Sequence, residues 1–185
     1  MKIEQNISLK PYNTFGIDVI ANNFVSVSDI DELKHILSLK NYPNKLILGG
    51  GSNMLLTKNF EGLVIHINLK GIEIVSQDDH FVYVKASAGE NWHEFVIWCI
   101  DNDFGGIENL SLIPGNVGTA PIQNIGAYGV ELKDVFDSCE AISINTQKLE
   151  TFTKETCHFG YRNSIFKNEV KGQYIVTNVI FKLTK

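Results

Sequence analysis

Residues 45–55 read KLILGGGSNML. The short apolar run at 45–48 predicts a buried strand, and three glycines follow it directly. Upstream, residues 24–27 form another β-prone run, and Ser28 with Asp31 resembles a capping box that opens a helix through Leu39. The order of strand, helix, strand and glycine loop predicts a β-α-β unit near the start of the chain.

The glycine loop has the composition of an anion-binding loop. Its three glycines permit positive φ angles and close backbone approach, so successive N–H groups can point at one anion. Ser52 and Asn53 add side-chain donors. Met54 stands where the fingerprint G-x-G-x-x-G needs its third glycine, and no Gly-Lys-Ser/Thr follows, which argues against a P-loop. A tight structural turn remains the alternative interpretation.

The rest of the chain predicts an α+β fold. Asn91 and Glu94 form a second capping box, and the helix that follows places its apolar residues on one face. We expect a small β-α-β part at residues 1–68 and a larger α+β part at residues 69–185. Further strands are predicted at 63–67, 72–75, 81–86, 140–145, 149–152 and 174–183.

Residues 109–130 contain no Asp, Glu, Lys, Arg or His, yet they include four glycines, two prolines and many apolar residues. A disordered linker would carry more charge and fewer apolar residues. The pattern favours backbone folded against a flat apolar group, such as a large planar cofactor. The side-chain amides of Gln123 and Asn124 would be available for hydrogen bonds. A buried structural loop is the alternative.

A third motif, residues 159–167, places Arg162 between aromatic residues and beside a glycine. Arginine in such a setting suits a partly desolvated site, where its planar guanidinium can hold a carboxylate with two hydrogen bonds. A structural ion pair is the alternative, and on sequence chemistry alone it is the more common case.

Composition narrows the functional classes. The net charge of −5 and pI near 5.5 argue against non-specific nucleic-acid binding. The three cysteines are widely spaced and the five histidines lack metal-ligand spacing, so we expect no disulfide framework and no metal site. No stretch reaches the length of a membrane span and the start lacks an apolar leader, so we expect a cytoplasmic protein without a membrane partner.

Six motifs together resemble, in order, the UDP-N-acetylenolpyruvoylglucosamine reductase family, also called UDP-N-acetylmuramate dehydrogenase. The resemblance covers nearly the whole chain, from Leu9 to Leu183. The motifs are NTFGI at 13–17, LGGGSN at 48–53, GENWH at 89–93, GIENL at 106–110, the stretch 113–132 and FGYRNSIFK at 159–167.

The resemblance implies a two-subdomain FAD-binding fold of the vanillyl-alcohol oxidase and p-cresol methylhydroxylase type. In that family the loop matching 49–53 holds the FAD pyrophosphate, and the stretch matching 113–129 lines the isoalloxazine ring. Residues 48–56 contain no His or Cys for covalent attachment, so we expect non-covalent FAD. The implied FAD-binding residues are Gly49, Gly50, Gly51, Ser52, Asn53, Met54, Ile113, Pro114, Gly118, Thr119, Ile122, Gln123, Asn124, Gly126, Tyr128 and Gly129.

The resemblance also implies a reaction. NADPH reduces FAD, and the flavin then reduces the enolpyruvyl double bond of UDP-N-acetylglucosamine enolpyruvate, a step of peptidoglycan precursor synthesis. Arg162 matches a catalytic arginine that stabilises developing negative charge, and Tyr161 is expected to contact substrate beside it. The family continues beyond the position of Lys185 into a substrate-binding domain with a serine proton donor and a glutamate. We therefore expect this chain alone to be inactive.

Two alternatives remain open at this level. An alcohol or sugar oxidase of the same fold would also hold FAD, but its reduced flavin would react rapidly with O₂ during turnover. A non-catalytic nucleotide-binding module would bind UDP or ADP without flavin colour. The sequence does not determine the oligomeric state.

Overall fold

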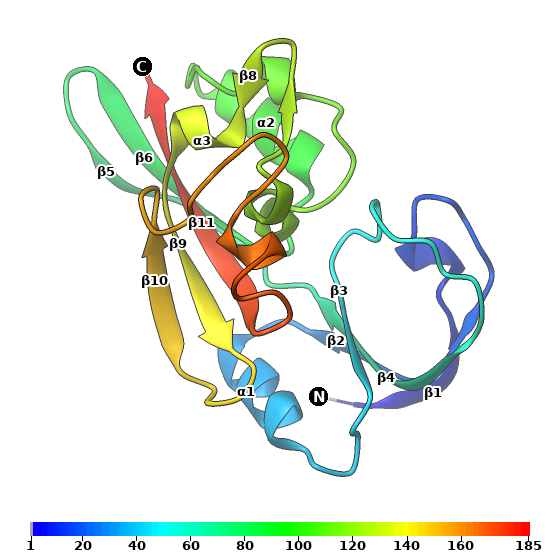
Figure 1. The fold of residues 1–185 in the computed structure, drawn as a ribbon. Coiled ribbons are helices and arrows are strands. Elements are labelled where there is room, and N and C mark those ends of the chain that lie inside the picture. Colours follow the sequence, from blue (N-terminus) through cyan, green and yellow to red (C-terminus); the bar gives the residue numbers. More distant parts are fainter. Residues whose placement is uncertain (1) are drawn as a thin grey trace.

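The computed structural model describes residues 2–185, whose two main β-sheets lie next to each other (Figure 1). The first sheet has four strands in the order β1-β2-β4-β3, where β1 is antiparallel to β2, and β2 and β3 both run parallel to β4. Helix α1 (Ile30–Ser38) connects β2 to β3, which confirms the β-α-β unit. The strands are β1 (Glu4–Ser8), β2 (Ile20–Val27), β3 (Lys45–Leu48) and β4 (Phe60–Ile67).

Helix α1 begins one residue later than the capping-box pattern predicts. Asp29, and not Ser28, is the N-cap, because its carboxylate accepts a hydrogen bond from the backbone N–H of Glu32 at 2.8 Å. The backbone N–H of Ser28 donates instead to the Glu32 carboxylate at 3.3 Å. Asp is as strong a cap as Ser, so the pattern alone did not separate the two.

The second sheet has five strands in the order β10-β9-β11-β6-β5, and every neighbouring pair is antiparallel. Strand β11 (Tyr174–Thr184) is central and largely buried on both faces, as its apolar sequence predicts. The α+β prediction is confirmed. The other strands are β5 (Ile72–Gln77), β6 (Phe81–Ser87), β9 (Phe136–Ser143) and β10 (Leu149–Thr153), with a two-stranded ribbon of β7 (Gly126–Ala127) and β8 (Val130–Glu131).

Two further helices accompany the second sheet, α2 (Trp92–Asp101) and the short α3 (Leu132–Val135). Asn91 caps α2 by accepting a hydrogen bond from the Glu94 backbone N–H at 3.1 Å, as the capping-box pattern predicts. Within residues 2–185, no helix has the length and apolar character that a membrane crossing requires. Short 3₁₀ helices are η1 (Lys10–Tyr12), η2 (Glu108–Leu110), η3 (Val117–Thr119), η4 (Pro121–Gln123) and η5 (Ile165–Lys167).

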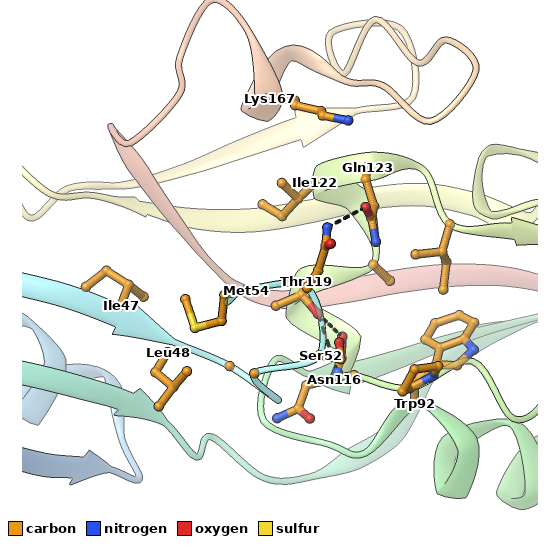
Figure 2. Close-up of a pocket in the computed structure, with 17 residues that line it drawn as sticks. Ile47, Leu48, Ser52, Met54, Trp92, Asn116, Thr119, Ile122, Gln123 and Lys167 are labelled. Atoms are coloured by element: carbon orange, nitrogen blue, oxygen red, sulfur yellow. Dashed lines mark hydrogen bonds between the residues drawn. The ribbon is translucent and has the colours of Figure 1, made fainter. Parts of the chain in front are cut away.

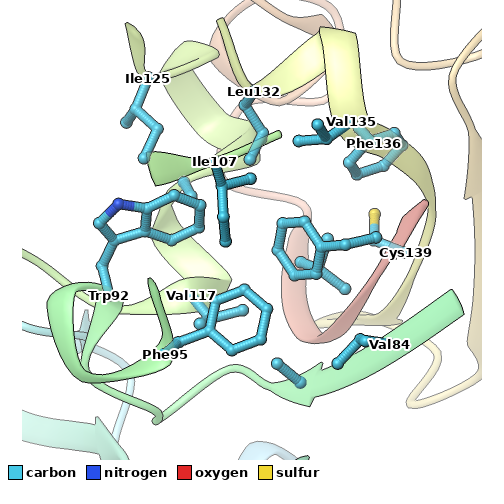
Figure 3. Packing of buried hydrophobic residues seen from close by; sticks show 14 of the residues in the cluster. Val84, Trp92, Phe95, Ile107, Val117, Ile125, Leu132, Val135, Phe136 and Cys139 are labelled. Atoms are coloured by element: carbon cyan, nitrogen blue, oxygen red, sulfur yellow. The ribbon is translucent and has the colours of Figure 1, made fainter. Parts of the chain in front are cut away.

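The main core lies between α2 and the five-stranded sheet (Figure 3). The rings of Phe95 on α2 and Phe181 on β11 pack with centroids 4.7 Å apart. All three cysteines are free and buried in this core. Burial raises the pKa of Cys99 to about 12, and a hydrogen bond to Cys157 together with burial raises the pKa of Cys139. Cys99 and Cys139 are therefore protonated thiols at neutral pH.

A second apolar cluster joins the two sheets. Leu33 and Ile36 on α1 share this cluster with Val25 of the first sheet and with Ile142 and Ile175 of the second. The chain passes from one sheet to the other between residues 67 and 72. The division into subdomains at residue 68 stays a prediction, and this shared cluster shows that the two sheets bury apolar surface together.

His66 on β4 is expected to make stability depend on pH. Its Nδ1 lies 3.0 Å from the Ser26 hydroxyl oxygen, and burial, with Lys70 nearby, lowers its pKa below the ordinary 6.5. The folded state thus binds a proton on His66 less readily than the unfolded state does. The contribution of neutral His66 to the free energy of unfolding is therefore fully present above about pH 6.5 and is lost as the pH falls below that value. Urea unfolding at pH 5.5, 6.5 and 7.5 measures this loss.

The matched variants are His66→Asn and His35→Asn. Asparagine does not titrate, so His66→Asn should flatten the slope of unfolding free energy against pH. His35 is exposed on α1, so His35→Asn is the control for replacing a histidine as such. An unaltered slope in His66→Asn would contradict the assignment.

Candidate functional site

An open cleft of about 230 Å³ lies between the glycine loop and the uncharged stretch (Figure 2). Met54 and Ser52 stand on one wall, and Ile122 and Gln123 stand on the other. The two predicted motifs, about 65 residues apart in sequence, therefore face each other. The residues that line the cleft are Ile47, Leu48, Gly49, Gly51, Ser52, Asn53, Met54, Trp92, Pro114, Gly115, Asn116, Thr119, Ala120, Ile122, Gln123, Ile125 and Lys167.

The glycine loop offers a row of free backbone donors. Strand β3 ends at Leu48, and Gly51 takes a left-handed conformation with φ +60°. Within residues 2–185, the backbone N–H groups at positions 50–53 have no hydrogen-bond acceptor, and neither does the Ser52 hydroxyl. Successive unpaired N–H groups around a left-handed glycine form a concave anion site. The loop therefore suits a phosphate or pyrophosphate group.

The loop is supported from behind by η1 and the turn that follows it. The backbone N–H of Thr14 donates to the carbonyl of Gly51 at 3.2 Å. A Cβ atom on Gly51 would overlap the carbonyl oxygen of Tyr12 and lie 2.9 Å from Cα of Asn13. Asn13 in turn fixes its own turn, because its Nδ2 donates to the carbonyls of Leu9 and Ile17 at 2.8 and 2.9 Å. Only glycine fits at position 51.

The two walls meet with almost no space between their backbones. A Cβ on Gly50 would lie 2.7 Å from Oδ1 of Asn116, and a Cβ on Gly115 would lie 2.9 Å from the Ser52 hydroxyl oxygen. These distances are shorter than normal van der Waals contact, so each glycine permits the approach of the other wall. We name this contact, Gly50 with Asn116 and Gly115 with Ser52, the glycine contact.

A side-chain hydrogen bond also spans the cleft. Asn53 Nδ2 donates to Gln123 Oε1 at 2.9 Å. The Gln123 amide nitrogen keeps its donors, because it forms no hydrogen bond within residues 2–185. Gln123 therefore offers the free amide that the sequence predicts, whereas Asn124 does not.

Asn124 is fully buried and its amide is engaged. Its Nδ2 donates to Glu131 Oε1 at 3.2 Å and to the Gly160 carbonyl at 3.0 Å, and its Oδ1 accepts from the Lys133 backbone N–H at 3.0 Å. The expectation of an available amide here is wrong. Asn124 instead fixes the turn after η4, where its φ is +44°, against the 159–167 motif.

Gly118 lets the second wall pack closely against Ala88. Its backbone N–H donates to the Ala88 carbonyl at 3.0 Å, and a Cβ on Gly118 would overlap the Ala88 side chain. Tyr128 does not line the cleft and is 88% exposed. The candidate FAD-binding residues that do not line the cleft are Gly50, Ile113, Gly118, Asn124, Gly126, Tyr128 and Gly129, and the candidate substrate residues Tyr161 and Arg162 do not line it either.

Arg162, the one arginine of the chain, lies beside the uncharged stretch. Its Nη2 donates to the Gly126 carbonyl at 2.5 Å, and its own carbonyl accepts from Lys167 Nζ at 3.0 Å. The side chain is exposed and Tyr161 next to it is 86% exposed, so the partly desolvated setting is not found. No carboxylate within residues 2–185 forms an ion pair with Arg162. The alternative interpretation, that Arg162 forms a structural ion pair, is therefore wrong.

Sequence reasoning missed several lining residues. The helical pattern assigns Trp92 to the core, and it is buried, yet it also borders the cleft. Lys167 is the only basic residue of the lining, and both Lys167 and Asn116 lie inside the quoted motifs. The motifs marked the right segments, but only the fold shows which side chains within them face the cleft.

The donors and the apolar lining of this cleft suit the chemistry of FAD. The free N–H groups at 50–53 can hold its pyrophosphate, and the apolar part of the lining can contact its ring. A family described as an FAD binding domain matches residues 21–151. This match covers more than half of the chain, so the chain belongs to the FAD-binding domain family, and the predicted FAD cofactor is confirmed.

Within that family, the chain matches UDP-N-acetylenolpyruvoylglucosamine reductases over its whole length. It is 63% identical to the enzyme named so in Flavobacterium johnsoniae and 49% identical to that of Amoebophilus asiaticus, covering 55% of each relative. The chain thus spans about half the length of these curated relatives.

Solved structures agree with the fold. The crystal structure of UDP-N-acetylenolpyruvylglucosamine reductase from Thermus caldophilus matches 99% of this chain and 62% of its own, with TM-score 0.76 and 28% identity. A cholesterol oxidase from Brevibacterium sterolicum matches with TM-score 0.66 and 14% identity, which shows the fold alone. The predicted two-part FAD-binding fold is confirmed.

Proposed function

We propose that this chain is the FAD-holding part of an NADPH-dependent reductase. Its substrate is UDP-N-acetylglucosamine enolpyruvate and its product is UDP-N-acetylmuramate, in the cytoplasm. The observation that carries the proposal is the row of unpaired N–H groups at 50–53 facing an apolar wall, in a chain whose whole length matches such reductases. Bound FAD supplies hydride transfer from NADPH to the enolpyruvyl group.

We assign the pyrophosphate of FAD to the glycine-loop wall and its ring to the second wall. The N–H groups at 50–53 and the Ser52 hydroxyl hold the pyrophosphate, while Gly49 and Met54 complete that wall. Pro114, Thr119 and Ile122 contact the ring and exclude water, and the free amide of Gln123 donates a hydrogen bond to it. The remaining candidate FAD-binding residues lie outside the lining and are proposed to support or extend the second wall. They are Ile113, Gly118, Asn124, Gly126, Tyr128 and Gly129.

Arg162 is the group of this chain proposed to act on the substrate. Reduction of the enolpyruvyl double bond builds negative charge on the substrate, and a fixed guanidinium stabilises that charge. The bond to the Gly126 carbonyl fixes the guanidinium beside the wall proposed for the ring. Tyr161, exposed next to it, is proposed to contact the substrate.

Two other functions share parts of this geometry. The likeness to cholesterol oxidases extends to the fold alone, so it gives no support to an alcohol or sugar oxidase. A non-catalytic nucleotide-binding module would use the glycine loop, but it would leave the apolar wall and Arg162 without a role. Fast reaction of the reduced flavin with O₂ during turnover of an alcohol would favour the oxidase.

FAD binding to the purified chain is the test. We expect the chain to take up FAD and to release all of it on acid precipitation, because the cleft lining contains no His or Cys that could attach flavin. The measurement is flavin absorbance in the supernatant and in the washed pellet. Yellow colour in the pellet contradicts non-covalent binding, and a chain that takes up no FAD contradicts the proposed function.

A further inference from the structure

The first turn of α2 holds the segment that leads into the second wall of the cleft. The backbone N–H of Trp92 donates to the Gly115 carbonyl at 3.0 Å, and its indole Nε1 donates to the Leu110 carbonyl at 2.8 Å. These two bonds fix both ends of the segment 110–115. The middle of the segment is held by the next helical residue, His93.

His93 Nδ1 receives two hydrogen bonds from this segment. The Leu112 backbone N–H lies 3.3 Å from it and the Ser111 hydroxyl lies 3.1 Å from it. A backbone amide can only donate, so Nδ1 must carry a free lone pair and the ring proton must sit on Nε2. The Ser111 hydroxyl then donates as well.

Leu112 has a conformation that needs such a partner. Its φ is +62°, in the left-handed region, which costs a non-glycine residue about 1–2 kcal/mol. Its side chain is 77% exposed, so packing does not supply the compensation. The N–H bond to His93 is the contact that holds this backbone. Two residues later comes Pro114, which lines the cleft.

We propose that His93 is a positioning residue of the FAD cleft, which holds residues 111–112 through an unprotonated Nδ1. Protonated Nδ1 would face two donors. The Ser111 hydroxyl can rotate to accept, but the Leu112 amide cannot. The proposal rests on the proposed function only in identifying the ligand of the cleft as FAD.

The segment that His93 holds carries no charged side chain of its own. Residues 109–130 carry no acidic, basic or histidine side chain. Helix α2 itself carries Glu94 and Asp101, and η2 carries Glu108, whose carboxylate accepts from the Gly106 backbone N–H at 2.8 Å. Within residues 2–185, no charged side chain is hydrogen-bonded to His93.

FAD affinity tests the proposal, with fluorescence quenching as the measurement. Losing one backbone hydrogen bond, worth about 1 kcal/mol, should weaken FAD binding about fivefold. His93→Ala should show this loss. His93→Asn, whose Oδ1 stands in for Nδ1 as the acceptor, should bind FAD as tightly as the parent chain.

His35→Asn serves as an exposed-histidine control. Equal affinity of His93→Ala and the parent chain would overturn the proposal, as would the same loss in His93→Asn. The cofactor-free chain allows an independent test: nitrogen NMR should place the ring proton on Nε2, and the Leu112 amide should exchange faster in His93→Ala. Failure of every chain to bind FAD would instead count against the proposed function, and the exchange measurement would still decide the role of His93.

Discussion

Replacing Gly51 by alanine is expected to weaken FAD binding by about 100-fold or more. The new Cβ would overlap the Tyr12 carbonyl oxygen, so the loop must move away from η1 and carry its N–H groups with it. Each hydrogen bond to a charged group contributes about 1.5–3 kcal/mol, so losing the alignment of two of them accounts for this loss. Titration of the chain with FAD measures it.

A second glycine separates the steric effect from the backbone effect. Gly172 also has a left-handed φ, +73°, but a Cβ there meets nothing within 4 Å. Gly172→Ala should therefore cost only the left-handed alanine conformation, about 1–2 kcal/mol, and leave FAD affinity unchanged. Gly51→Ala should unfold more easily than Gly172→Ala in urea. Normal FAD affinity in Gly51→Ala would mean that the loop does not hold the pyrophosphate.

Replacing Arg162 by methionine is expected to slow substrate reduction by about 10²–10³ in kcat, the usual cost of removing one fixed charge-stabilising group. The test uses an enzyme of the relatives' full length, because this chain spans about half of that length. Because the chain is 63% identical to the Flavobacterium johnsoniae reductase, it can replace the matching half of that enzyme in a chimera. FAD should stay bound in the variant, because the glycine loop is untouched.

Rapid mixing of each half-reaction identifies the role of Arg162. Flavin reduction by NADPH should change little, while reduction of the enolpyruvyl substrate should slow sharply. Arg162→Lys should recover only part of the rate, since an ammonium group lacks the planar pair of donors. Lys171→Met removes an exposed cation away from the cleft and should change neither step. Equal slowing of both steps would show that Arg162 acts by shaping the flavin site.

Local patterns predicted most of the fold because the residues that specify each element are neighbours in sequence. Asn91 and Glu94 define the start of α2, and the apolar run at 45–48 defines β3. Strand β1 was missed because its sequence, EQNIS, lacks the apolar alternation of a half-buried strand and the strand lies exposed at the sheet edge. Its pairing with β2 is what makes it a strand.

The candidate site was predicted as segments and not as side chains. Asn124 illustrates the limit: its partners at Glu131, Lys133 and Gly160 lie up to 36 residues away, so no local pattern indicates that its amide is engaged. From the glycine-loop pattern, anion binding is the only reason for a glycine at position 51. The structure adds a second reason, because a Cβ there would overlap the carbonyl oxygen of Tyr12, which lies 39 residues earlier in the chain. Such contacts depend on the tertiary fold.

The glycine contact limits how this cleft can be redesigned. The backbone of one wall limits the side-chain volume that the other wall can hold. A substitution that a relative tolerates can therefore fail here when the residue facing it across the glycine contact is not changed as well. Paired substitutions across the contact, at 50 with 116 or at 52 with 115, are therefore non-additive. Loop grafting between homologous flavoproteins has to transfer residues 49–53 and 113–119 as one unit, because neither loop is an independent module.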